Sequence, residues 1–180
     1  ENMKSLTKEQ QRNLASINPY YAKAFEQMKL QIDAKVAESK VKAGKRIREV
    51  PSVSEKKLFD AIMARYKGKV VMVDLWATWC GPCRGAIASF EPRKNKFKDK
   101  DVVFVYITNE SSPESKWLEM VAGIEGEHYR LNRKQWDYIC DYFGVDGIPS
   151  YVIVDRDGNA RLRNDLRGSG MLEQELSGML

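Results

Sequence analysis

The sequence has few of the residues that build metal centres or disulfide frameworks. Its 180 residues include three cysteines, Cys80, Cys83 and Cys140, and a single histidine, His128. Three cysteines are too few for a small domain that depends on several disulfides. A structural zinc site needs four ligands, so zinc at the first two cysteines would also require Cys140 and His128. We regard zinc as the weaker alternative and expect no metal.

Long apolar runs are also missing. No stretch approaches the ~18 to 20 consecutive apolar residues that a membrane-spanning helix requires. The sequence starts at Glu1 without a charged segment followed by an apolar run, which predicts that any export signal has been removed or lies outside it. The length suits one domain of roughly 100 to 150 residues with an appendage, and it excludes a multi-domain enzyme.

The basic excess is confined to the N-terminal part. Residues 1–50 carry 11 basic and 6 acidic side chains and residues 51–180 carry 19 of each, so the first 50 residues supply the whole formal net charge of +5. A nucleic-acid-binding domain would carry a basic face on its folded part, and we therefore expect no nucleic acid as a partner. We interpret the lysines of residues 1–50 as solvated helix faces, with membrane or nucleic-acid contact as the weaker alternative.

Two helices are predicted within residues 1–44. Asn18 before Pro19 indicates an N-cap followed by proline at the first helical position. Beyond it, apolar residues recur at steps of three and four and form one helical face, which consists of Tyr21, Phe25, Met28, Ile32 and Val36. Residues 42–48 are expected to be a solvated linker, and Pro51 marks a boundary. We therefore divide the chain into a basic, helical N-terminal extension with its linker, residues 1–50, and a folded domain, residues 51–180.

Strands and helices alternate in the predicted domain. The apolar runs at residues 70–76 and 102–107 are typical of strands buried on both faces, and a short extended piece is expected near Tyr129. Asp157-Gly158 between β-forming segments predicts a hairpin of residues 151–154 and 160–162. Helices are expected over residues 54–66, 84–98, 112–123, 133–143 and 170–180. This order predicts an α/β fold with mixed strand pairing.

The cysteine pair lies where a buried strand gives way to a helix. Cys80 is expected at the helix N-cap, where unpaired N–H groups and the helix dipole favour a thiolate. Cys83 follows one turn later, within reach of a mixed disulfide formed by Cys80. These positions predict Cys80 as the nucleophile and Cys83 as the resolving thiol.

Two further positions are candidates for the same chemistry. Asp74 is a carboxylate within an apolar strand, so burial should raise its pKa and allow it to relay protons to and from Cys83. A structural aspartate satisfied by backbone donors is the alternative. Pro149, preceded by Gly147-Ile148 and followed by a strand, is expected to form a cis peptide bond that exposes backbone groups to an extended substrate; an ordinary trans proline is the alternative.

The segment of residues 73–84, Val-Asp-Leu-Trp-Ala-Thr-Trp-Cys-Gly-Pro-Cys-Arg, resembles the active-site signature of thioredoxin-like proteins, in particular the TlpA/ResA-like thiol-disulfide oxidoreductases. Residues 142–151, followed by Asp157-Gly158, are similar to the cis-proline segment and hairpin of that family. The resemblance covers roughly residues 54–180. It implies a thioredoxin fold, a central mixed β-sheet flanked by helices, here with an N-terminal helical extension.

The resemblance also implies roles for individual residues. It supports Cys80, Cys83 and Asp74 as the catalytic group. The residues that it implies for substrate binding are Trp79, Gly81, Pro82, Ile148 and Pro149. It implies that the Cys80–Cys83 couple needs no other cofactor.

The sequence departs from the family at two places. Many members carry a glutamate and a proline where Ala86 and Ala88 stand, so Asp74 is expected to do the proton work alone. Residues 102–107 contain no lysine, unlike plain thioredoxin, and we expect Asp74 to lack a stabilising cation.

The main functional hypothesis is a reductant of protein disulfides. The resemblance implies an exported, periplasmic or membrane-anchored protein that receives electrons from a thiol protein or membrane reductase, with a membrane tether outside this sequence. One alternative is a disulfide isomerase that dimerises through its N-terminal helices; another is the C-terminal module of a larger binding protein. Cys140 is expected to be a buried, inert thiol, and His128 a solvated surface residue.

Overall fold

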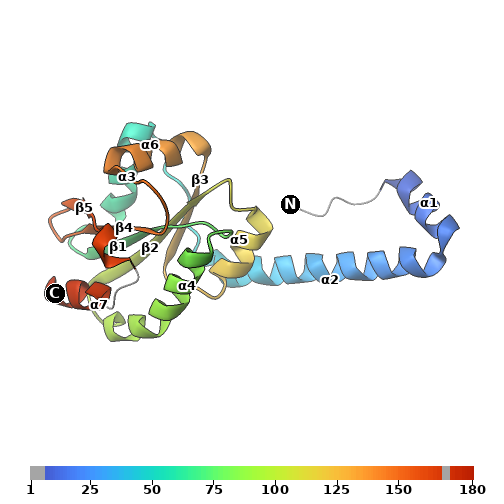
Figure 1. Ribbon diagram of the computed structural model, residues 1–180, viewed down its shortest axis with the longest axis horizontal. Coiled ribbons are helices and arrows are strands. Elements are labelled where there is room, and N and C mark those ends of the chain that lie inside the picture. The colour runs from blue at the N-terminus through green and yellow to red at the C-terminus, as the bar shows by residue number, and fades with distance from the viewer. Residues whose placement is uncertain (1–6, 168–170) are drawn as a thin grey trace.

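The computed structural model describes residues 7–167 and 171–180. Its centre is a five-stranded sheet in the order β3-β2-β1-β4-β5 (Figure 1). The strands are β1 (Val70–Leu75), β2 (Val102–Asn109), β3 (Glu127–Leu131), β4 (Ser150–Val154) and β5 (Ala160–Leu162). β1, β2 and β3 run parallel, while β4 is antiparallel to β1 and β5 antiparallel to β4. The predicted mixed α/β sheet and its hairpin are confirmed.

Helices cover both faces of this sheet (Figure 1). Alternate residues of β1 point to opposite faces, so Val70 and Met72 belong to one apolar cluster and Val71 and Val73 to the other. The first face is covered by α4 (Gly81–Phe90), the 3₁₀ segment η2 (Glu91–Phe97), α5 (Glu114–Val121) and α7 (Met171–Gly178). The second face is covered by α3 (Glu55–Met63) and α6 (Arg133–Phe143). β1 is therefore buried on both faces, as its apolar run predicted.

Four expected helices are shorter in the structure than in the prediction, and one of them is α5, which spans residues 114–121 of the expected 112–123. The helix expected over residues 84–98 is α-helical only to Phe90 and continues as the 3₁₀ segment η2, which has Pro92 in its first turn. Proline cannot donate the backbone hydrogen bond of a helix interior, which accounts for the break. α3 likewise ends at Met63 and gives way to the 3₁₀ segment η1 (Ala64–Tyr66). The last helix is α7, and residue 170 of its expected range lies outside the described residues.

The N-terminal extension consists of two helices, as expected. α1 (Lys8–Ile17) has a capping box made by Thr7 and Gln10. α2 (Pro19–Gly44) is capped by Asn18, whose side-chain oxygen accepts the Tyr20 N–H at 2.9 Å. With 26 residues, α2 is about 39 Å long and extends away from the domain as an arm (Figure 1).

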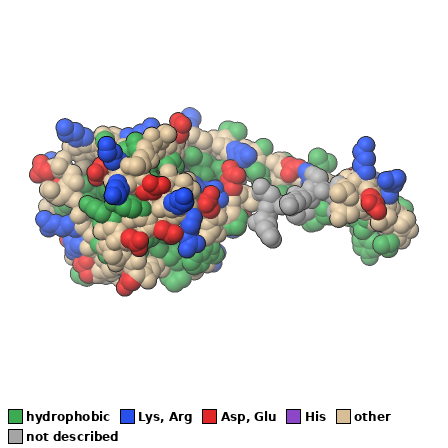
Figure 2. All heavy atoms as spheres, turned by 90° about the horizontal axis from the view of Figure 1, so that it is seen from above, with side chains coloured by type: hydrophobic (Ala, Val, Ile, Leu, Met, Phe, Trp, Pro, Cys, Tyr) green, Lys and Arg blue, Asp and Glu red, His purple; other side chains and the backbone are tan. Residues whose placement is uncertain are grey.

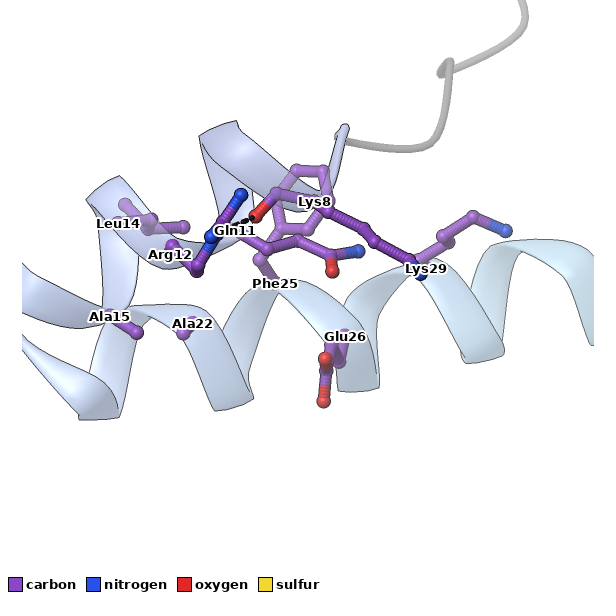
Figure 3. Close-up of a pocket in the computed structure, with 9 residues that line it drawn as sticks. All are labelled: Lys8, Gln11, Arg12, Leu14, Ala15, Ala22, Phe25, Glu26 and Lys29. Atoms are coloured by element: carbon purple, nitrogen blue, oxygen red, sulfur yellow. Dashed lines mark hydrogen bonds between the residues drawn. The ribbon is translucent and has the colours of Figure 1, made fainter.

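α1 folds back against the outer part of α2. The apolar residues that line the groove between them are Leu14, Ala15, Ala22 and Phe25, and the Phe25 ring points from α2 toward α1 (Figure 3). Its charged and polar lining residues are Lys8, Gln11, Arg12, Glu26 and Lys29. Much of the predicted apolar face of α2 is exposed, since Tyr21 is 57% and Met28 47% accessible.

The expected solvated linker at residues 42–48 is wrong in part: residues 44 and 45 are exposed, but residues 42–44 are the end of α2 and residues 46–48 are half-buried. Ala43 is fully buried, and Ile47 forms a parallel bridge with His128 at the edge of β3. The guanidinium of Arg46 donates to the carbonyls of Val121, Ala122 and Ile124, which follow α5 or end it. This segment is attached to the sheet edge because its backbone pairs with β3. The boundary between residues 50 and 51 stays a prediction.

Within the part of the chain that the structure describes, no helix has the length and apolarity needed to cross a membrane. Acidic and basic side chains are interspersed on the visible face of the folded domain (Figure 2). This mixture agrees with the equal numbers of acidic and basic residues in residues 51–180.

Candidate active site

The cysteine pair lies at the start of α4, directly after the loop that follows β1. Cys80 is the N-cap residue in an extended conformation, and its Sγ accepts the Cys83 N–H at 3.2 Å. The two cysteines form a disulfide with an S–S distance of 2.02 Å. Cys80 is 5% exposed and Cys83 is fully buried. An N-cap sulfur receives a backbone N–H and faces the positive end of the helix dipole, so this position stabilises a thiolate at Cys80.

Asp74 lies on the same face of the sheet as Cys83. It is 2% exposed, and its Oδ1 has no hydrogen-bond partner among residues 7–167 and 171–180. Burial raises the pKa of Asp74 to about 8, against a smaller opposing effect of Lys94. A structural aspartate would have its oxygens satisfied by donors, so the orphaned oxygen favours a group that exchanges a proton.

Lys94 supplies the cation that was predicted to be missing because residues 102–107 contain no lysine, and its charge lowers the pKa of Asp74. It comes from η2 and not from a strand, and its side chain is only 4% exposed. Its ammonium donates to Glu91 at 2.6 Å and to the Glu125 carbonyl at 2.5 Å, and it lies 4.6 Å from the centre of the Tyr106 ring. The expectation that Asp74 lacks a cation is therefore wrong; no periodicity in the sequence marks a lysine in a 3₁₀ segment as buried.

The Ile148–Pro149 peptide bond is cis, as expected. Pro149 directly precedes β4, the strand that pairs with β1 on the side opposite β2. The Ile148 carbonyl oxygen lies 3.7 Å from the Cys80 Sγ. The fold thus brings together two motifs that are 68 residues apart in the chain.

Trp79, Gly81 and Pro82 form an exposed rim next to the buried sulfurs. Trp79 is 62% exposed, and its indole N–H donates to the Ser111 hydroxyl at 3.0 Å. Ser112 beside it accepts the Thr78 N–H at 3.0 Å. The two serines position the loop that carries Trp79, and the sequence patterns did not indicate this function.

A groove of about 560 Å³ adjoins this rim. Pro82 and Pro149 stand at its active-site end, and α4 and α7 supply much of the remainder. Its other lining residues are Gly85, Ala86, Ser89, Phe90, Arg93, Tyr151, Leu166, Arg167, Leu172 and Glu173.

His128 is not at the surface, contrary to expectation. Its side chain is fully buried and stacks on the Tyr106 ring with centroids 5.0 Å apart. Its Nε2 lies 3.1 Å from the Ile124 carbonyl oxygen, and burial lowers its pKa to about 4. The acidic and basic neighbours in the sequence suggested solvent, but residues 46–48 pair with this strand and cover it.

Cys140 is only half-buried, so the prediction that its thiol lies in the core is wrong. Its neighbour Ile139 is the residue of α6 that is buried. Partial burial raises the pKa of Cys140 to about 11, which keeps this cysteine a thiol at neutral pH.

Comparisons with known proteins agree with this geometry. The family model described as thioredoxin-like matches residues 68–160. Over 92 residues, or 51% of the chain, the sequence is 39% identical to the thioredoxin-like protein YneN of Bacillus subtilis and 24% identical to the thiol-disulfide oxidoreductase ResA of Bacillus thuringiensis. These matches cover 54% of YneN and 52% of ResA, so the chain spans about half the length of these curated relatives.

A crystal structure from Bacteroides vulgatus, provisionally named a thiol-disulfide oxidoreductase, superimposes with a TM-score of 0.53 and 27% identity. The superposition covers 66% of this chain and 83% of that one. The matched residues 68–160 contain the cysteine pair, the buried aspartate and the cis-proline, and on these grounds the chain belongs to the thioredoxin-like family.

Proposed function

We propose that the protein is a thiol-disulfide oxidoreductase that reduces disulfides of other proteins, with the Cys80–Cys83 couple as its redox group. The observation that carries this proposal is the N-cap position of Cys80, which receives the Cys83 N–H and has Cys83 within disulfide reach. Relatives named as thiol-disulfide oxidoreductases, such as ResA, support it.

The proposed reaction moves two electrons from the dithiol to the substrate. The Cys80 thiolate attacks one sulfur of the substrate disulfide, which forms a mixed disulfide and releases the other substrate sulfur as a thiolate. Asp74 accepts the proton of Cys83, and the Cys83 thiolate then attacks the Cys80 sulfur. This step releases the second substrate thiolate and leaves the Cys80–Cys83 disulfide, which a donor dithiol must reduce again.

The substrate contacts are proposed for residues at the rim. Trp79, Gly81 and Pro82 are exposed beside the sulfurs, and the backbone of Ile148 and Pro149 lies next to Cys80. An extended segment of a substrate protein could pair with this backbone as an added strand does. We further propose an exported location and a thiol protein or membrane reductase as electron donor, on the strength of the TlpA/ResA resemblance.

Two measurements test the proposal. The first is reduction of insulin disulfides with dithiothreitol as donor, in which Cys80→Ser should abolish turnover and Cys83→Ser should accumulate a mixed disulfide with the substrate. Equal activity of the wild type and Cys80→Ser would contradict the proposal.

The second measurement is the reduction potential of the Cys80–Cys83 couple in glutathione or dithiothreitol buffers. A value near that of thioredoxin, about −270 mV, supports a reductant, whereas about −120 to −180 mV indicates an oxidase or isomerase.

A dimeric isomerase is the second candidate, because the N-terminal arm exposes large apolar side chains. Tyr20 is 73% and Leu30 69% accessible. Light scattering decides between a reductase and a dimeric isomerase. A wild-type dimer together with a monomeric Tyr20→Ser/Leu30→Ser variant favours the isomerase. A monomer in both proteins removes this candidate.

A further inference from the structure

Arg167, at the end of the 3₁₀ segment η3 (Asn164–Leu166), is bonded to the loop that carries the cis-proline. Its Nε donates to the Pro149 carbonyl at 2.5 Å, and its Nη2 donates to the Gly147 carbonyl at 2.8 Å and the Ser150 hydroxyl at 2.6 Å. The same Nη2 lies 3.3 Å from a carboxylate oxygen of Asp146. One side chain thus bonds the residues on both sides of Ile148.

The backbone of Ile148 lies next to the nucleophile Cys80. Ile148 lies between the two carbonyls that Arg167 binds, and its own carbonyl oxygen is 3.7 Å from the Cys80 Sγ. Because the neighbouring carbonyls are engaged by a guanidinium, they point toward Arg167, which fixes the direction of the backbone groups at Ile148. Bonds from a charged donor are stronger than those between neutral groups, so this loop is held firmly from one side.

We propose that Arg167 is a positioning residue for polypeptide substrates: it holds residues 147–150 in the orientation in which their backbone can pair with the segment that flanks a substrate cysteine. This inference rests on the proposed function, since it names the residue that prepares the substrate-binding edge of that site. The hydrogen bonds of the Arg167 side chain that the structure describes go to residues 146–150 and not to either sulfur, so Arg167 acts through the loop.

The planar guanidinium is essential to this arrangement. Arginine presents several donors in a rigid fork, whereas lysine offers a single flexible point charge that cannot bridge the Gly147 and Pro149 carbonyls in the same way. The ion pair with Asp146 matters less, because the Asp146 carboxylate is 80% exposed and exposed pairs contribute little. If the two-carbonyl contact matters, Arg167→Lys should lower the rate with a peptide probe. If only the positive charge matters, Arg167→Lys should leave that rate unchanged.

The test compares two disulfide probes on one thiol. In a Cys83→Ser/Cys140→Ser background, Cys80 is the only cysteine. One probe is a short extended peptide with a central cysteine, and the other is 2-mercaptoethanol, each carried as its mixed disulfide with thionitrobenzoate. The Cys80 thiolate attacks the peptide or mercaptoethanol sulfur, forms a new disulfide with it and expels thionitrobenzoate, whose absorbance gives the rate.

Arg167→Gln should lower the rate with the peptide about five- to tenfold, as expected for about 1 kcal/mol of lost orientation, and leave the rate with mercaptoethanol unchanged. Arg167→Lys should lower the peptide rate in the same direction by about two- to fivefold, and it keeps the proposal testable if the glutamine variant does not fold. Arg163→Gln is the matched control, because Arg163 binds Asp165 and Glu175 and not the loop.

Two results would overturn the inference. An equal loss of rate with both probes would show that Arg167 acts on the thiolate or on the fold as a whole. No loss of rate with either probe would show that the orientation of residues 147–150 does not depend on Arg167. These probes require only a reactive thiol at Cys80. A wild-type protein that fails to reduce insulin would contradict the proposed function, whereas the ratio of the peptide rate to the mercaptoethanol rate would still test the function of Arg167.

Discussion

The ammonium of Lys94 lies 4.6 Å from the centre of the Tyr106 ring, and Tyr106 is paired with Asp74 across strands β1 and β2. A buried cation therefore lies on the same face of the sheet as the buried carboxylate. Burial lowers the pKa of Lys94, and its bond to Glu91 opposes that change. The proton affinity of Asp74 is set by two opposing effects, since desolvation raises its pKa and Lys94 lowers it.

Replacement of Lys94 should make Asp74 hold its proton more tightly. We expect Lys94→Met to raise the pKa of Asp74 above its present value of about 8, because the opposing positive charge is removed. Infrared or NMR titration of the Asp74 carboxyl measures this shift. Lys96→Met is the control, because Lys96 is 65% exposed and binds Glu173 at the surface; an equal shift in both variants would contradict a specific effect of Lys94.

Asp74→Asn should stabilise the protein at neutral pH. Native Asp74 keeps its proton to about pH 8, whereas the unfolded chain loses it near pH 3.9. The native state therefore binds more protons between these values, and this group makes stability fall as pH rises from about 4 to 8. Chemical denaturation of the disulfide form should show Asp74→Asn about 3 to 4 kcal/mol more stable than the wild type at pH 7, with no such gain at pH 3.5.

The same variant should impair turnover. With a pKa of about 8, about a tenth of the Asp74 carboxyls are ionised at pH 7, and these accept the Cys83 proton. Without them, release of substrate from the mixed disulfide should slow about ten- to a hundredfold at pH 7. Single-turnover kinetics with insulin measures this step. A variant that is stabilised but not slowed would indicate that Asp74 is protonated in the native protein and takes no part in the transfer of the Cys83 proton.

His128 should make the protein sensitive to acid. Its pKa is lowered to about 4 by burial, while histidine in the unfolded chain titrates near 6.5. The unfolded state then binds more protons between pH 6.5 and 4, so this group makes stability fall by about 3 kcal/mol as the pH decreases through that window. His128→Phe keeps an aromatic ring stacked on Tyr106 but cannot titrate, so its free energy of unfolding should change less between pH 6.5 and 4. Identical pH dependence of the wild type and the variant would disprove the contribution of His128.

Trp79 should contribute to substrate binding and little to stability. Because its side chain is 62% exposed, Trp79→Ala should change the free energy of unfolding by less than about 1 kcal/mol. We expect kcat/KM for insulin to decrease about fivefold, as for the loss of roughly 1 kcal/mol of contact, with the rate of reduction by dithiothreitol unchanged. Tyr142→Ala is a matched control, since Tyr142 is 66% exposed on α6, on the other face of the sheet.

The local patterns determined the reactive pair, the strands and the ends of several helices. An apolar run followed by Cys-Gly-Pro-Cys placed Cys80 at an N-cap, and Asn18-Pro19 placed the start of α2, because backbone capping depends on a few adjacent residues. Asp74 was predicted to be buried because every neighbour in its strand is apolar, which is also a local pattern.

Only the tertiary structure decided which distant groups meet. Residues 42–48, with their basic side chains around Gly44, were predicted to be a linker, yet the backbone of residues 46–48 pairs with β3 and covers His128. Lys94 is buried because its long side chain reaches from η2 over Tyr106, and Arg167, which follows the hairpin in the chain, donates to the Pro149 carbonyl. Such contacts depend on how elements pack, and a charged side chain carries no periodic signal that would reveal where its end will lie.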